Sequence, residues 1–377
     1  ALAALGAAPQ LRAENAAAEP KTLEEQVTYF ENALSEALTA RDWKMLELAA
    51  EGFRTVKLSG KDLEISVLRA ERNAAWGGGS GGFGMMGFPS GASRGLVECW
   101  GLAARGLSGN ADALKSLREC ATAELAPVSA PDPKTYRQNP TEYWAAQKGF
   151  TAYTTAVQKK DQACLALALL KDTGIQKTAL ERVRTWKDAS AQTYYMGQST
   201  AIDPVVEAVV VAEPLAGWKE LTAALNEPDE KVSSEAKVHL LGALMSLCQY
   251  RNPQPQFGAM MAFSIDTDVA AMLPQDAQMQ LLKPYTLAVK NWKPEGNQQS
   301  KSLWPIINMA QSLPLLPENS ETLTELEALK TRMQGDAQRQ MLQQSLDYAL
   351  AKQKKTAPNS SQHGAVKPPK APGEGDF

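Results

Sequence analysis

The chain has 377 residues, of which 44% are hydrophobic and 21% charged, and its 39 basic and 42 acidic residues give a formal net charge of −3. This length suits about two to three domains or one elongated array. The folded part has no dense run of Lys and Arg of the kind that binds phosphates, so we expect no nucleic-acid partner. No stretch reaches ~18 apolar residues, so we expect no membrane span.

The N-terminal residues are small and apolar from Ala1 to Ala8, and an alanine-rich polar stretch continues to Pro20. This pattern is typical of the end of a secretory signal segment followed by a processed or flexible arm, which we place at residues 1–21. We therefore expect an exported protein, periplasmic or secreted, from a cell with a bacterial-type envelope. A flexible N-terminus with no targeting role is the alternative.

Three amphipathic helices are predicted between residues 22 and 76. Thr22 and Glu25 have the spacing of a capping box, in which each side chain binds a backbone N–H of the other residue. Apolar residues then recur every three or four positions, which places them on one face of a helix. In the first helix these are Leu23, Val27, Phe30, Leu34 and Leu38. Similar spacings after Asp42 and after Lys61 predict the second and third helices.

Residues 77–95 form a glycine-rich insert that carries four large apolar side chains, Phe83, Met85, Met86 and Phe88. Glycine loses much conformational entropy on ordering, so we expect a loop. The four side chains are the candidate contacts of this loop with a protein partner. A plain connection that tucks them against the core is the alternative.

Two cysteines belong to a helical hairpin predicted around residues 106–110, which completes an N-terminal helical region at 22–125. Cys99 and Cys120 would face each other across the hairpin. A disulfide needs Cα atoms within about 7 Å, whereas helix axes usually lie about 8–10 Å apart. A Cys99–Cys120 disulfide and two buried thiols therefore both stay open, and the spacing favours the thiols.

A proline-rich stretch at 126–139 predicts an extended linker. Asn139, Pro140 and Glu142 then provide an N-cap, a proline at the first helical position and an acid in the first turn, a combination that starts a helix. Helical spacing continues through a C-terminal helical-repeat region at 140–353. Residues 354–377 have few apolar side chains to bury, so we expect a disordered tail there.

One segment of the C-terminal region is compatible with either a strand or a helix. The valines between Val205 and Val211 are compatible with a strand. Asp203 followed by Pro204 is a helix start, however, so we predict a buried helix.

Residues 229–244 resemble the second helix of a HEAT-type repeat. The similarity lies in Asp229-Glu230-Lys231-Val232, in Ala236 and Leu240, and in Gly242-Ala243-Leu244, with Ser233 in the place where HEAT repeats often have Arg. The resemblance covers about 20 residues. It implies an α-solenoid, a stack of helical hairpins with a concave binding face.

Motifs for catalysis or cofactor binding lack their structural context. Residues 82–87 match GxGxxG, but a helix rather than a strand precedes them. Ser80 and Ser93 each lie in a GxSxG match, yet the chain has two histidines, and His363 lies in the predicted tail while His239 lies within a helix. No cysteine lies in a CxxC pair. We therefore expect no catalytic centre, no metal site and no cofactor.

Aromatic residues suggest one binding surface, because their faces stack on sugar rings. The candidates in or near irregular segments are Tyr136, Tyr143, Trp144, Tyr194 and Tyr195, and the alternative is that they pack between helices. The sequence thus predicts an all-α, irregular helical-repeat array with disordered termini. We expect a non-enzymatic, exported protein-interaction or scaffolding protein whose partner is an unidentified protein. A glycan-binding or carbohydrate-active all-α protein is the alternative.

Overall fold

The computed structural model describes residues 22–76, 94–185, 203–250, 264–293, 303–312, 320–333 and 335–356. Within these ranges the regular elements are helices and no strand occurs, which confirms the predicted all-α class. The chain divides into two compact units, Ala1–Pro284 and Tyr285–Phe377, which we describe separately. No helix of the described ranges has the length and apolar character that a membrane crossing requires.

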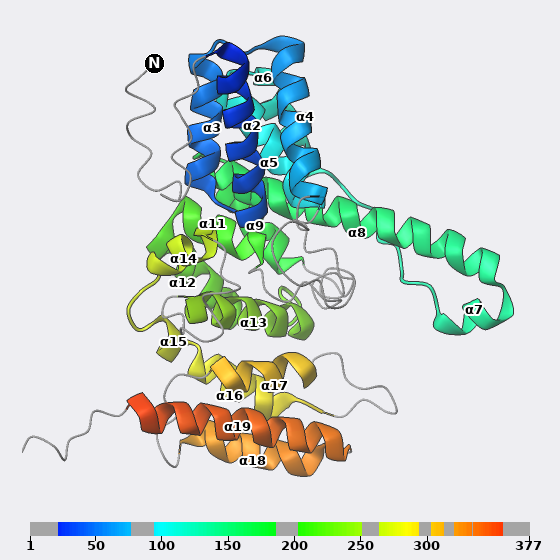
Figure 1. Cartoon of the computed structure of the whole chain (residues 1–377). Coiled ribbons are helices and arrows are strands. Elements are labelled where there is room, and N and C mark those ends of the chain that lie inside the picture. Colours follow the sequence, from blue (N-terminus) through cyan, green and yellow to red (C-terminus); the bar gives the residue numbers. More distant parts are fainter. Residues whose placement is uncertain are drawn as a thin grey trace, which may run out of the picture. The chain divides into compact units, whose positions relative to one another are not determined.

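The first unit begins with five helices packed as neighbours. Figure 1 shows α2 between α3 and α4, and α5 contacts all three of these helices as well as α6. Leu34, Phe53 and Trp100 are fully buried between them. The predicted capping box is present, since Thr22 and Glu25 each accept a hydrogen bond from the other's backbone N–H. The bounds are α2 (Leu23–Ala40), α3 (Trp43–Thr55), α4 (Gly60–Trp76), α5 (Arg94–Leu107) and α6 (Ala111–Thr122).

The 30-residue helix α8 (Pro140–Leu169) joins this bundle to the rest of the first unit. Its second half, from Val157 to Ala168, is largely buried, and α8 packs against α5, α6 and α11. Its first half, residues 140–156, has no buried side chain. The predicted start is confirmed, because the Asn139 side chain accepts a hydrogen bond from the Glu142 N–H.

The segment predicted as an extended linker contains a short helix, α7 (Pro133–Gln138), which packs beside the first half of α8 (Figure 1). Asp132 caps α7 by accepting from the Lys134 N–H, and Pro133 occupies the first helical position. The expectation of extended chain throughout 126–139 was therefore wrong. Proline at the first position of a helix costs no hydrogen bond, so it starts a helix as readily as it extends a linker.

The remaining helices of the first unit follow α8 in the chain. The valine-rich segment is the buried helix α11, as predicted, and it packs against α8, α9 and α12. The Trp218 indole N–H donates to the Gln280 side-chain oxygen at 2.7 Å, which fixes α12 to α15. The bounds are α9 (Ile175–Arg184), α11 (Pro204–Ala212), α12 (Pro214–Ala224), α13 (Ser234–Tyr250), α14 (Ser264–Ala271) and α15 (Ala277–Gln280).

The second unit contains most of α16 (Leu282–Asn291) and the helices α17 (Leu303–Ser312), α18 (Glu321–Arg332) and α19 (Asp336–Thr356). The fully buried Tyr285 hydroxyl donates to the Ile306 carbonyl at 2.9 Å. The Arg332 guanidinium donates to the carbonyls of Val289, Lys290 and Trp292, so it caps the end of α16. The last predicted helix is divided near Gly335, and residues 357–377 of the predicted tail lie outside the described residues.

Candidate functional site

The buried charged groups of the first unit hold helices together. Asp203 caps α11 through Oδ1, which accepts from the N–H groups of Val205 and Val206, while its Oδ2 lies 3.0 Å from Nε2 of His239 on α13. The buried Asp161 carboxylate of α8 accepts from Arg182 of α9 at 2.9 Å. Each of these carboxylates connects two elements, which accounts for its burial without a ligand.

The cysteines of this region lack the properties of a reactive site. Burial raises the pKa of the Cys164 thiol to about 12 and raises that of Cys99 further, so both are protonated near neutral pH. Burial also raises the pKa of the less buried Cys120. In the structure Cys99 and Cys120 are thiols and not a disulfide, and the Cys99 Sγ donates to the Lys159 carbonyl of α8 at 3.2 Å. Among the described residues no group of three or more His, Cys, Asp or Glu side chains is placed to hold a metal ion.

An exposed aromatic cluster lies at the start of α8. Tyr136 of α7 contacts Tyr143 and Trp144 edge to face, with ring centroids 5.4 and 6.0 Å apart, and Tyr143 contacts Trp144 at 5.5 Å. Trp144 is 59% exposed and Tyr136 is 48% exposed. We call α7, the first half of α8 and these three rings the aromatic arm. The rings stabilise the packing of α7 on α8 and still leave aromatic surface in solvent.

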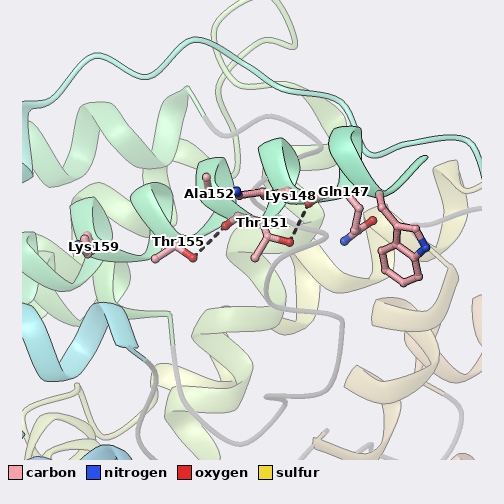
Figure 2. A pocket seen from close by; sticks show the side chains of 7 residues that line it. Gln147, Lys148, Thr151, Ala152, Thr155 and Lys159 are labelled. Carbon is pink, nitrogen blue, oxygen red and sulfur yellow. Dashed lines mark hydrogen bonds between the residues drawn. The ribbon is translucent and has the colours of Figure 1, made fainter. Parts of the chain in front are cut away.

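A shallow groove of about 600 Å³ runs along one face of α8 from Trp144 to Lys159. Figure 2 shows the lining side chains on successive turns of α8. Thr151 and Thr155 donate to the carbonyls of Gln147 and Thr151, four residues earlier in each case. The lining residues are Trp144, Gln147, Lys148, Thr151, Ala152, Thr155 and Lys159.

The first half of α8 carries little charge for an exposed helix. Between Pro140 and Gln158 only Glu142 and Lys148 carry charge, whereas protein surfaces are commonly about 25–35% charged. Four aromatic residues lie in the same stretch: Tyr143, Trp144, Phe150 and Tyr153. Depletion of charge together with enrichment of Tyr and Trp is the composition of the buried centre of an interface.

The structure brings together three of the predicted glycan-stacking residues, Tyr136, Tyr143 and Trp144. The other two, Tyr194 and Tyr195, lie outside the described residues. The candidate interaction loop with Phe83, Met85, Met86 and Phe88 also lies outside them. Helix α7 was not predicted, although Asp132 followed by Pro133 has the order of a helix start.

The comparisons with known proteins identify no relative. No family model, no curated protein and no solved structure matches this chain. The aromatic arm is therefore characterised by its own geometry and composition alone.

Proposed function

We propose that this chain is a non-enzymatic protein-interaction or scaffolding protein that uses the aromatic arm to contact a protein partner. The helices behind the arm serve in this proposal as an irregular, HEAT-like helical-repeat body that holds it. The observation that carries the proposal is the exposed, charge-poor first half of α8, with Trp144 on its surface and Tyr136 of α7 beside it. Export to the periplasm or out of the cell stays a prediction.

The physical reason is the contrast between the two halves of one helix. An isolated helix shorter than ~12–15 residues is marginal in water, and most helical stability comes from packing of an apolar face. The buried residues of α8 lie from Val157 onward, and α8 packs against α5, α6 and α11, whereas Figure 1 shows α7 beside its first half. Covering the exposed rings with a partner would supply apolar burial there, and Trp and Tyr are the residues that most often dominate binding energy.

The proposal is tested by affinity capture from a native extract, using the full chain with Trp144→Ala and Tyr136→Ala together. We expect the double variant to lose the captured protein while its circular dichroism stays unchanged. Tyr348→Ala is the matched control, because Tyr348 on α19 is 52% exposed and lies in the second unit. Equal capture by the native chain and by the arm variant would contradict the proposal.

Glycan binding at the same arm is the second candidate function. It is favoured by the exposed aromatic rings beside an open groove that also presents the neutral side chains of Gln147 and Thr151, since aromatic faces can stack on sugar rings. A glycan array tests whether the arm binds glycans. Binding that Trp144→Ala abolishes would favour this function, and the absence of binding across the array would remove it.

A further inference from the structure

A buried carboxyl group of α4 lies against α5, outside the aromatic arm. Glu71 of α4 is only 9% exposed, and its Oε1 atom is buried without a hydrogen-bond partner. The carboxyl occupies the space that a side chain at Gly101 of α5 would fill, because a Cβ atom there would lie 1.8 Å from Glu71 Oε1. A glycine at position 101 is therefore what allows the carboxyl to lie against α5.

The charges around Glu71 stabilise its ionised form only weakly. From α5, the Nη2 atom of Arg105 lies 3.7 Å from Oε1, which is beyond hydrogen-bond distance, and Arg105 also faces Glu64 at 4.0 Å. Glu98 of α5 adds a like charge, although it pairs with Lys159.

On the α2 side of α4, the buried Glu31 faces Arg69 at 3.5 Å. The net result for Glu71 is a pKa raised from 4.5 to about 7, first by burial and then by Glu98, with Arg105 acting in the opposite direction.

We propose that Glu71 is a proton-responsive latch between α4 and α5. The neutral carboxyl lies against Gly101 and leaves the two helices packed. The ionised carboxylate, buried with an oxygen that accepts no hydrogen bond, favours opening of this contact, because burying a charge without adequate partners is costly. The device would make the packing of α4 on α5 respond to pH near neutrality.

The sign of the effect follows from proton linkage. The folded chain binds the Glu71 proton more tightly than the unfolded chain does, so the stabilisation is complete below pH 4.5 and is lost as the pH rises through about 7. Between pH 6.0 and 7.5 these two pKa values give an increase of up to about eightfold in the opening equilibrium.

Hydrogen exchange of the full chain at pH 6.0 and 7.5, normalised for intrinsic exchange rates, tests the latch. In the native chain we expect the protection of α4 and α5 amides to fall by about five- to eightfold over this interval. Glu71→Gln and Glu71→Met should both remove this pH-dependent loss of protection. Two variants are used so that the test stands if one of them fails to fold. Glu36→Gln, at an exposed position on α2, should behave as the native chain does.

Two results would overturn the proposal. The first is the same pH-dependent loss of protection in the native chain and in a folded, uncharged Glu71 variant. The second is a loss spread evenly over α2 to α15, because the latch acts on the contact between α4 and α5.

Discussion

The ion pair between Arg41 and Glu207 allows the sharpest test of what holds the first unit together. The Arg41 Nη2 atom lies 2.7 Å from Glu207 Oε2, and the two side chains are 2% and 0% exposed. Arg41 caps the end of α2 with φ of 49°, and its carbonyl accepts from the Ile265 N–H of α14 at 3.1 Å. Residues from α2, α11 and α14 therefore meet at this one buried pair.

Replacement of Arg41 by Met leaves the Glu207 carboxylate buried without its cation, which should destabilise the chain by about 3–5 kcal/mol. Both Arg and Met are strained at positive φ, so backbone strain cancels in the comparison. The double variant Arg41→Met/Glu207→Leu removes both charges and should lie within about 2 kcal/mol of the native chain, since apolar replacements of buried pairs are often neutral.

Urea unfolding followed by tryptophan fluorescence gives the four stabilities of this double-mutant cycle, provided that the m-value is unchanged. The matched control is the exposed pair of Arg54 and Glu51 on α3, with side chains 61% and 47% exposed, for which the coupling should be about 0–1 kcal/mol. A coupling energy for Arg41 and Glu207 no larger than that of this exposed pair would refute the reasoning.

Three further outcomes are expected. Gly149→Ala should stabilise the chain by about 0.5–1 kcal/mol, because alanine is the better helix former and the space around Gly149 is open. Gly217→Ala should destabilise it by about 1–3 kcal/mol, because the new Cβ would lie 2.3 Å from the Val209 carbonyl oxygen; urea midpoints that move in the same direction for both variants would contradict this pair. In the native protein at pH 8, a thiol reagent should label Cys120 before Cys164, whose pKa burial raises to about 12; peptide mapping shows the order, and equal labelling rates would disprove it.

Local signals in the sequence predicted several helix starts, three of which show the reason clearly. The capping box at Thr22, the Asn139 cap before Pro140 and the Asp203 cap before Pro204 each satisfy backbone N–H groups within a few residues, so the neighbouring sequence contains the information. Even the valine-rich α11 was predicted correctly, because its start decided between helix and strand.

Contacts between distant residues could not be predicted in this way. Arg41 and Glu207 are separated by 166 positions, and a charged residue looks the same in the sequence whether it is buried in a pair or exposed. The contact of Glu71 with Gly101 depends on how α4 lies on α5. The same limit applies to α8, because its change from exposed to buried at Val157 depends on packing against α5, α6 and α11, which apolar spacing alone does not show.

The few potentially reactive side chains of the first unit take part in contacts within the fold, which leaves the aromatic arm as the candidate site. His239 lies against Asp203, Asp161 accepts from Arg182, and Cys164 is a buried thiol, so each of these groups contributes to contacts between helices. The rings of Tyr136 and Trp144 differ from them, because they are ordered by contact with each other and yet present surface to solvent. Surface of this kind lowers the free energy of the chain only when something covers it. That is the reason for placing recognition on the aromatic arm rather than in the interior.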